Sequence, residues 1–288
     1  MARDPVSGME VMNQKQVEER KRIEERMAKI KYKIMVLSNK GGVGKTTVAV
    51  NLATGFTLQG FRVGLMDADF HGPNIPKMLG LSGKRMVLNN GGMVPISLSL
   101  DNGLLKVVSL AFLAEKDSAV IWRGMLKMSV INQFLADVQW GELDYLIVDM
   151  PPGTSDEPLS VAQLVPGARA VIVTTAQEVA LLDSRKAVDF ARKLSVPVTG
   201  IVENMSGLLC PHCYQEIELF GKGGGQRAAR ELGVPFLGRI PLEPAIVRSG
   251  DDGKPFIREN VGKKEIAPFL EILKKIGAGM NADDERLE

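Results

Sequence analysis

A glycine-rich stretch from Lys40 to Thr47 constrains the fold of this chain more than any other feature. It reads Lys-Gly-Gly-Val-Gly-Lys-Thr-Thr and follows closely on the apolar run from Ile34 to Leu37. Glycine has no Cβ, so a loop rich in glycine can turn its backbone N–H groups toward phosphate oxygens. The sequence therefore predicts a buried strand, a phosphate-binding loop and a helix, in this order.

The residues of this loop have separate expected roles. Lys45 places a positive charge on the β and γ phosphates of a nucleoside triphosphate, and the Thr46 hydroxyl is a candidate ligand of Mg²⁺. The helix that begins here directs the positive end of its dipole at the anion. The residues expected to contact the nucleotide through the loop are Gly41, Gly42, Val43, Gly44, Lys45, Thr46 and Thr47.

Short apolar runs alternate with amphipathic stretches along the rest of the chain. Apolar, β-branched runs separated by helices predict a mostly parallel sheet with helices on both faces. The predicted strands are Ile34–Leu37, Arg62–Met66, Leu104–Leu110, Tyr145–Val148, Ala170–Thr174, Val198–Val202 and Pro235–Ile240. The predicted helices include Thr46–Gln59, Lys127–Val138, Val179–Lys193 and Gly224–Leu232. We therefore expect an α/β fold of the P-loop NTPase type, with ligands at the carboxyl ends of the strands.

Other segments depart from this alternation. The charge-dense stretch from Gln14 to Lys31 predicts a solvated helix that docks loosely on the body, with a partner-binding helix as the alternative. The tract from Leu81 to Leu104 contains Asn-Asn-Gly-Gly and predicts a loop and a hairpin within the same domain. The expected division is an N-terminal helical extension, 1–31, a single domain, 32–280, which contains a cysteine loop, 205–220, and an acidic tail, 281–288.

Composition agrees with a globular protein. The chain has 288 residues, of which 45% are hydrophobic and 24% charged, enough for a sizeable core. A net charge of +2 gives no reason to expect nucleic acid as a partner. No apolar run approaches the ~20 residues of a membrane span and the start of the chain is charged, so we expect no membrane association and a cytoplasmic protein. Two cysteines are too few for a disulfide framework.

Acidic residues follow two of the predicted strands. The run that ends at Met66 continues as Asp67-Ala68-Asp69, and alternation of side chains places both carboxylates on one side, near the magnesium and the γ phosphate. We expect Asp69 to position the attacking water. Asp149 follows four apolar residues and is expected to orient Mg²⁺ through water or through Thr46. A turn carboxylate is the alternative for each aspartate, and it suits one aspartate more easily than a pair.

The phosphate loop departs from the standard pattern, because Asn39 stands where glycine is expected. Asparagine tolerates the left-handed backbone, so the turn can survive. A second lysine, Lys40, makes the loop resemble the deviant Walker A loop of the ATPase class that includes the MinD, ParA, nitrogenase iron protein and Mrp families. In that class the early lysine reaches across a dimer to the partner's nucleotide, which implies this role for Lys40. A solvated loop lysine is the alternative.

The same resemblance suggests how the base is bound. No Asn-Lys-x-Asp tetrapeptide follows the phosphate loop, so ATP is favoured over GTP. The resemblance implies that Asn204 reads the adenine edge, that a second base-contacting loop begins at Pro241, and that Asp67 lies near the magnesium shell. A turn residue is the alternative for Asn204.

Both cysteines lie in one tetrapeptide, Cys210-Pro211-His212-Cys213. Two thiolates can hold one edge of a metal centre, but a tetrahedral site or a 4Fe–4S cluster takes four. A twofold dimer would bring Cys210 and Cys213 of both chains together. Zinc would accept the same four sulfurs, with His212 as an outside candidate ligand. A redox disulfide and a buried structural pair are further alternatives.

Four motifs together narrow the resemblance. They are Trp122-Arg123-Gly124, Val138-Gln139-Trp140-Gly141, the Asp-Met-Pro-Pro-Gly-Thr run from Asp149, and Asn-Met-Ser…Cys-Pro-x-Cys from Asn204 to Cys213. From Lys33 to Gly277 the chain resembles the Mrp (ApbC-like) family of iron–sulfur cluster carrier ATPases. The resemblance implies a homodimer that binds ATP and Mg²⁺, hydrolyses ATP slowly, holds a 4Fe–4S cluster between two subunits and transfers it to apo iron–sulfur proteins.

Two other functions remain open. A positioning ATPase of the MinD or ParA type would need a C-terminal membrane helix or a basic DNA-binding face. The stretch from Ile266 to Ile276 is amphipathic through Phe269, Leu270, Leu273 and Ile276, but core packing explains this pattern better. The other function is a nucleotide switch with a structural zinc at the dimer interface.

Overall fold

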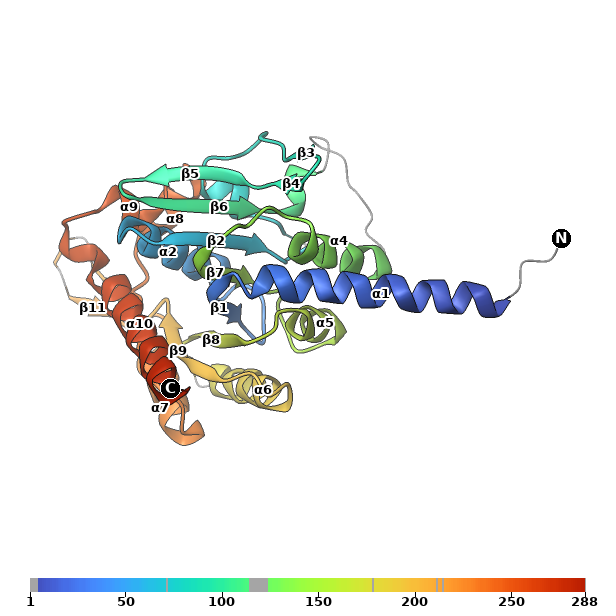
Figure 1. Cartoon of the computed structure of the whole chain (residues 1–288). Helices are drawn as coiled ribbons and strands as arrows, with labels where there is room; N and C mark the ends of the chain where they lie inside the picture. Colours follow the sequence, from blue (N-terminus) through green and yellow to red (C-terminus); the bar gives the residue numbers. More distant parts are fainter. Residues whose placement is uncertain are drawn as a thin grey trace.

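The computed structural model describes residues 5–70, 72–113, 124–177, 179–210, 212–213 and 215–287. An eight-stranded sheet forms the centre of the molecule, with the strand order β12-β9-β8-β1-β7-β2-β6-β5 (Figure 1). In this order the strands are Phe236–Arg239, Val198–Asn204, Ala168–Thr175, Ile30–Leu37, Leu143–Asp149, Arg62–Asp67, Gly103–Val108 and Ile96–Leu100. All neighbouring pairs in this sheet are parallel except β5 with β6, which confirms the predicted α/β fold.

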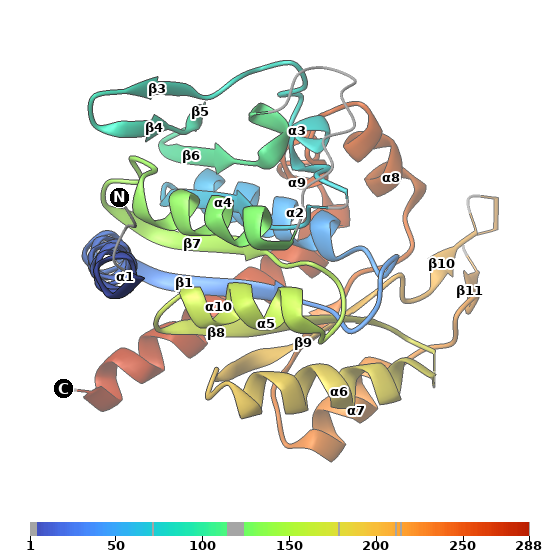
Figure 2. The same ribbon diagram turned by 90° about the vertical axis from the view of Figure 1, so that its right-hand side faces the viewer.

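Helices cover both faces of this sheet (Figures 1 and 2). One face carries α2 (Lys45–Leu58), α9 (Phe256–Glu259) and α10 (Ala267–Leu287), and the other carries α1 (Pro5–Met27), α4 (Gly124–Ala136), α5 (Asp156–Leu164), α6 (Val179–Lys193) and α7 (Gly224–Leu232). Alternate residues of β1 pack into two separate apolar clusters, Ile34 and Val36 on one face and Met35 and Leu37 on the other. A strand buried on both faces must be apolar throughout, which is why β1 reads as a continuous run.

The remaining described elements are short. They are α3 (Ile75–Met78), α8 (Pro244–Asp251), two 3-10 helices (Leu110–Phe112 and Lys264–Ile266), a hairpin of β3 (Val87–Asn89) with β4 (Gly92–Val94), and a second hairpin of β10 (Leu208–Leu209) with β11 (Glu216–Ile217). The expected hairpin in the tract from Leu81 to Leu104 is confirmed. The same tract also supplies β5, which the sequence analysis missed. β5 lies at the sheet edge with a mixed burial pattern, so its composition does not resemble that of the buried strands.

The helix predicted from Gln14 to Lys31 is wrong at its C-terminal end, because α1 ends at Met27 and β1 begins at Ile30. Loose docking is also wrong for the last turns. Ile23 and Met27 are buried beside α4, and the Arg26 guanidinium donates to the Val138 carbonyl at 2.9 Å. A thin apolar stripe is therefore enough to fix the end of α1, while its N-terminal part extends away from the body (Figure 1).

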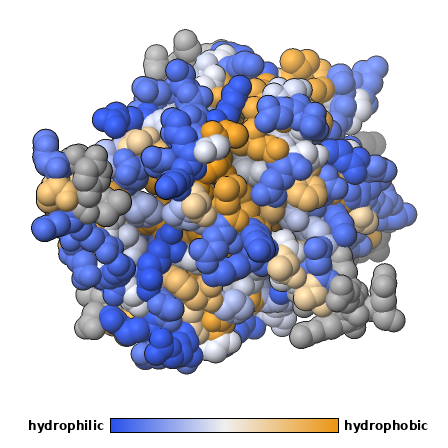
Figure 3. Space-filling view, turned by 90° about the vertical axis from the view of Figure 1, so that its left-hand side faces the viewer, coloured by the Kyte–Doolittle hydropathy of each residue, from blue (hydrophilic) through white to orange (hydrophobic). Residues whose placement is uncertain are grey.

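The C-terminal helix packs as the sequence analysis preferred. Phe269, Leu273 and Ile276 are buried, whereas Leu270 is 42% exposed and does not belong to the buried stripe. α10 continues to Leu287, so the expected acidic tail extends this helix. The side of the molecule seen in Figure 3 is largely hydrophilic, with a hydrophobic patch that extends from its upper edge to its centre. Among the described helices, none combines the length and the apolar character that crossing a bilayer requires.

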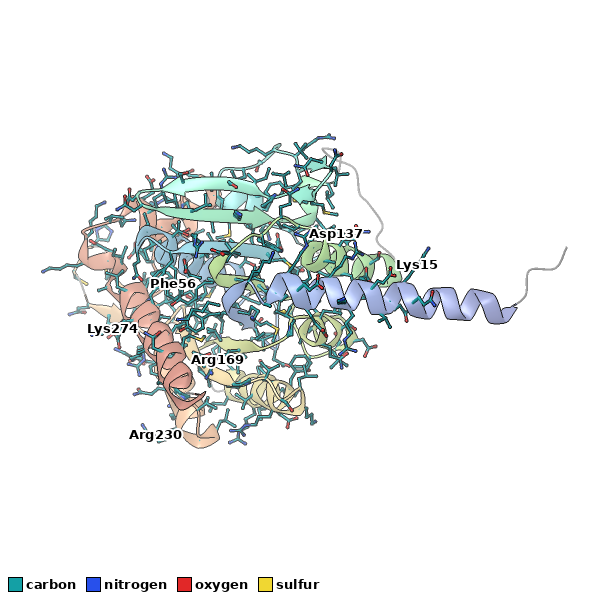
Figure 4. The ribbon with its side chains drawn as sticks, viewed as in Figure 1. Lys15, Phe56, Asp137, Arg169, Arg230 and Lys274 are labelled. Carbon is teal, nitrogen blue, oxygen red and sulfur yellow. The ribbon has the colours of Figure 1, made fainter. Side chains whose placement is uncertain are left out.

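Side chains follow the same division between core and surface (Figure 4). Phe56 of α2 stacks on Tyr145 of β7 with ring centroids 4.1 Å apart, inside the molecule. Lys15, Arg230 and Lys274 lie on the outer surface of their helices. The core therefore sits between the sheet and each helical layer, and it leaves the carboxyl edge of the sheet free for a site.

Candidate functional site

The phosphate loop lies where predicted, between β1 and α2. Gly42 and Gly44 have φ angles of 78° and 81°, a left-handed conformation that glycine adopts without strain. Gly44 is also the N-cap of α2, and no side chain caps this helix. The backbone N–H groups of the first turn are therefore available to an anion, and the helix dipole favours its binding.

The charged residues predicted to act together are brought together. Lys45 is 6% exposed, and its Nζ lies 2.6 Å from Asp149 Oδ1 and 3.9 Å from Asp69 Oδ2. The Thr46 hydroxyl donates to Asp149 Oδ2 at 2.6 Å. Asp67 lies opposite Asp149 in the pairing of β2 with β7, and it accepts a hydrogen bond from Ser109 at 3.0 Å. Asp67, Asp69 and Asp149 form a carboxylate cluster around one buried lysine.

Burial dominates the electrostatics of this cluster. It raises the pKa of Asp67 well above the ordinary value, and the neighbouring Asp149 carboxylate raises it further. Burial also raises the pKa of Asp149, although Lys45 and Thr46 oppose the shift. The positive charge of Lys45 therefore compensates the two buried carboxylates, Asp67 and Asp149, only in part.

The donor set at this cluster fits Mg²⁺. Carboxylate and hydroxyl oxygens are hard ligands, and in proteins one or two carboxylates commonly hold the ion together with substrate phosphates. Thr46, Asp149 and Asp67 are the residues that would hold it. The ion would neutralise charge on the β and γ phosphates. Among the described residues, no group of three or more His, Cys, Asp or Glu side chains is placed to hold a metal ion on its own.

Asp67→Asn should stabilise the protein in the absence of nucleotide at neutral pH. The pKa of Asp67 is higher in the folded state than its ordinary 3.8, so above pH 3.8 the folded protein keeps a proton that the unfolded chain loses. The contribution of Asp67 to the stability of the wild type is therefore highest below about pH 3.8 and is lost as pH rises through the folded-state pKa, whereas asparagine has no proton to lose. We expect the variant to melt a few degrees higher than the wild type near pH 7.5, since about 1 kcal/mol shifts the melting temperature by roughly 2–4 °C in a chain of this size. Thermal unfolding from pH 5 to 8 tests this, and a difference that grows toward low pH would contradict it.

A cavity of about 400 Å³ adjoins the phosphate loop and suits the nucleoside. Asn204 and Pro241 line it, as predicted. The other lining residues are Thr46, Thr47, Asn74, Lys77, Met78, Met205, Leu242, Glu243, Ile246, Val247, Gly250 and Asp251. Sequence analysis missed the walls from α3 and α8. Pro244 at the start of α8 and the Glu243 N-cap before it were the available signal for that helix.

Asn204 has a contact that its sequence position did not suggest. Its side chain is 6% exposed and donates to the Val43 carbonyl of the phosphate loop at 2.8 Å. A Cβ at Gly44 would collide with this side-chain amide, so the glycine allows the close approach. Asn204 therefore supports the loop as well as lining the cavity.

Lys40 lies at the surface beside α6. Its Nζ is 3.6 Å from Asp183 Oδ2, and the neighbouring Asn39 amide donates to Asp183 Oδ1 at 2.7 Å. The Lys40 side chain is 39% exposed. Sequence analysis missed Asp183, because a carboxylate at a partly exposed helix position carries no signal of its own.

The cysteines lie on a projection that we name the cysteine hairpin, residues 206–223. β10 and β11 form its stem, and the Cys210 N–H donates to the Gln215 carbonyl at 2.9 Å. Cys210 is half-buried, Cys213 is exposed and both are free. Hydrogen bonds from the backbone of Cys213 and of His212 lower the pKa of Cys210. This favours the thiolate, which is the metal-binding form.

The cysteine hairpin lies at the same edge of the molecule as the phosphate loop (Figure 2). His212 is exposed, and among the described residues no third ligand joins the two cysteines. The motif sits between two strands, whereas a thioredoxin-type pair opens a helix. One chain thus offers two sulfur ligands.

Two sequence motifs have other outcomes. Trp122 and Arg123 lie outside the described residues. Trp140 is 1% exposed and its Nε1–H donates to the Phe134 carbonyl at 2.9 Å. The motif from Val138 to Gly141 therefore serves the core beneath α4.

The parallel sheet, the glycine loop before α2 and the Asp149 contact with Thr46 define a P-loop NTPase. Residues 29–277 match the family model described as ParA: NUBPL iron-transfer P-loop NTPase, and the chain belongs to this family.

Named relatives agree with this assignment. The chain is 48% identical to an iron–sulfur cluster carrier protein of Methanocaldococcus jannaschii, over 88% of this chain and 87% of that protein. It is 46% identical to an iron–sulfur cluster carrier protein of Saccharolobus solfataricus, over 88% and 86%. The resemblance to the iron–sulfur carrier family is confirmed.

Solved structures support the fold. A nucleotide-binding protein from Archaeoglobus fulgidus in complex with ADP, with cobalt, is 40% identical, with a TM-score of 0.73 over 82% of this chain and 92% of that chain. The cell division ATPase MinD of Pyrococcus furiosus is 23% identical, with a TM-score of 0.64 over 86% and 99%. The second likeness concerns the fold alone.

Proposed function

We propose that this protein is an ATP-binding and ATP-hydrolysing carrier of iron–sulfur clusters. It acts as a homodimer, holds a 4Fe–4S cluster between two subunits as its cargo and transfers the cluster to apo-proteins. One observation carries the proposal: an exposed hairpin at the same edge of the molecule as the phosphate loop presents Cys210 and Cys213 as free thiols. Two such hairpins related by a twofold axis supply the four sulfurs that a cluster takes.

The nucleotide half of the proposal rests on the carboxylate cluster. Lys45 and the N-terminus of α2 hold the phosphates, and the cavity lined by Asn204 and Pro241 takes the adenosine. Asp69, whose side chain is 16% exposed beside Lys45, positions the attacking water. Hydrolysis of ATP is slow, because coupling to cluster transfer requires the ATP-bound state to last long enough for the transfer. The relative from Archaeoglobus fulgidus, in complex with ADP, supports nucleotide binding here.

Lys40 is the proposed contact between subunits. It lies on the surface, and its ion pair with Asp183 at 3.6 Å is long, so the lysine can turn to a nucleotide on a facing subunit. The same twofold axis would then serve both Lys40 and the cysteines. Binding of ATP would draw the subunits together and alter the spacing or exposure of the interfacial thiols, while hydrolysis resets them.

The proposal extends to partners and location. Apo iron–sulfur proteins are the acceptors, as the names of the carrier relatives suggest. A cytoplasmic location remains part of the proposal, because a carrier of this kind needs reduced thiols.

Cys210→Ser together with Cys213→Ser should abolish iron binding. After anaerobic reconstitution we expect about four iron and four sulfide per wild-type dimer and none in the double variant, since no other cysteine can replace them. Absorbance in the iron–sulfur charge-transfer region and assays of iron and sulfide measure this. His212→Ala is the control, and it should keep its iron.

The same experiment separates the alternatives. Iron retained by the double variant, or full iron in a monomer, would overturn the proposal. In a positioning ATPase, the two cysteine substitutions would leave the function unchanged, because that function does not use the thiols. A nucleotide switch with structural zinc would bind zinc but assemble no iron and sulfide under anaerobic conditions.

A further inference from the structure

Glu203 is a fully buried carboxylate that the proposed chemistry does not use. It lies near the end of β9 and is 0% exposed. Oε1 accepts from the Ser206 hydroxyl and from the Gly223 N–H at 3.0 Å, and Oε2 accepts from the Gly225 N–H at 2.7 Å. Arg239 Nε lies 3.3 Å from Oε1. A buried charge with this many donors is held in one position.

The three hydrogen-bond donors to Glu203 lie at the two ends of the cysteine hairpin or directly after it. Ser206 is its first residue and Gly223 its last, and Gly225 lies in the first turn of α7 directly after it. A Cβ at Gly225 would approach Glu203 and Thr174 closely, so a glycine is needed where helix and carboxylate meet. One side chain therefore fixes both ends of the segment that carries Cys210 and Cys213.

The opposite side of the same strand faces the nucleoside cavity, which Asn204 lines. Successive side chains of a strand alternate, so Asn204 points away from Glu203 and donates to the Val43 carbonyl of the phosphate loop. The backbone adds a second connection. The Ile240 N–H donates to the Glu203 carbonyl at 2.8 Å, and the Leu242 N–H donates to the Gly207 carbonyl at 2.8 Å. Leu242 lines the nucleoside cavity.

Met205 stands between these two faces in an unusual conformation. Its φ is +55°, a left-handed conformation that is strained for a residue with a side chain. It also lines the nucleoside cavity. A strained residue that touches the nucleotide site and leads directly into Ser206 can transmit a shift of a bound base to the hairpin.

We propose that Glu203 is a positioning residue, which ties the cysteine hairpin to the nucleotide site so that occupancy of that site changes the exposure of Cys210 and Cys213. The proposal rests on the proposed function, because it assigns a purpose to the link between nucleotide and thiols. Its test needs no cluster, so the two can fail separately.

The test compares thiol alkylation in the full-length protein, without metal, in the absence and presence of ADP or ATP. In the wild type, nucleotide should change the iodoacetamide rate of Cys210 severalfold. In Glu203→Gln, an amide NH₂ replaces one acceptor and faces donors. We expect the rate without nucleotide to rise about tenfold and the response to nucleotide to vanish, while the Kd for ADP stays within about twofold.

Two further variants complete the design. Glu216→Gln makes the same substitution on the hairpin itself, where Glu216 is exposed and bonded to Lys222 at 2.6 Å, and it should leave both the rate and the response unchanged. Ser206→Ala removes one donor and should give an intermediate effect, so the test survives if Glu203→Gln fails to fold.

Each outcome decides the proposal. A wild type whose alkylation ignores nucleotide overturns it, and so does a Glu203→Gln or Ser206→Ala protein that keeps the full response. Loss of ADP binding in Glu203→Gln also overturns it, because Glu203 would then only hold the fold of the nucleotide site. Iron retained without cysteines would reject the carrier function and leave this result intact.

Discussion

Lys45→Ala is expected to abolish nucleotide binding in practice, with a loss of affinity on the order of 10²–10³-fold, as for one partner of a buried charge pair. Lys45 is the cation in contact with Asp149 and close to Asp69. Without it, the phosphates would approach the carboxylate cluster with only the N-terminus of α2 in their favour. Asp149 would also lose its ion pair, so we expect a lower melting temperature as well.

Titration with ADP and ATP, followed by calorimetry, measures this loss. Thermal stabilisation by nucleotide should disappear in parallel, because a ligand stabilises only the state that it binds. Lys77→Ala is the matched control. Lys77 is an exposed lysine that lines the same cavity, and its removal should change affinity by no more than about threefold. Wild-type affinity in Lys45→Ala would refute the assignment of the phosphate site.

Asp69→Asn is expected to lower the rate of ATP hydrolysis on the order of 10²–10³-fold while ATP still binds, as for loss of a group that orients or deprotonates the nucleophile. Asp69 lies just past the end of β2, with Oδ2 3.9 Å from Lys45 Nζ, and its side chain is 16% exposed. It is therefore close to the lysine expected to bind the phosphates, and it is partly open to water. Asparagine keeps the shape of the side chain and removes its charge.

Phosphate release under single-turnover conditions measures the effect, and ADP titration checks binding. Asp251→Asn is the control, because Asp251 lines the same cavity but does not belong to the carboxylate cluster, and its substitution should leave the rate unchanged. If Asp69→Asn hydrolyses ATP at the wild-type rate, another group positions the water. If Asp69→Asn no longer binds ATP, Asp69 acts in ATP binding and not in the hydrolysis step.

The sheet and the phosphate loop were predictable because their signals are local. β-branched runs indicate buried strands, and the glycines of the loop indicate a backbone that turns its N–H groups toward phosphate. The ends of α6 and α7 were both placed correctly, since periodicity covers their whole length. β5 was missed because an edge strand with one solvated face has the composition of a hairpin.

The partners of the site residues were not predictable in the same way. Asp183 contacts Asn39, Asn204 contacts Val43, and these residues are 144 and 161 positions apart in the chain. Such pairs exist only after the sheet has brought β1, β8 and β9 side by side. Glu203 also looked ordinary, because nothing next to it in sequence shows that Gly223 and Gly225 fold back onto it.

The grip of Asp149 on both Lys45 and Thr46 has a consequence for ligand entry. Asp149 neutralises Lys45 and accepts a hydrogen bond from the Thr46 hydroxyl. The phosphates of an incoming nucleoside triphosphate must displace the Asp149 carboxylate from Lys45. Selectivity then depends on the new partners that the ligand provides for Asp149 and Thr46. A nucleotide without a divalent cation should therefore bind weakly at this site.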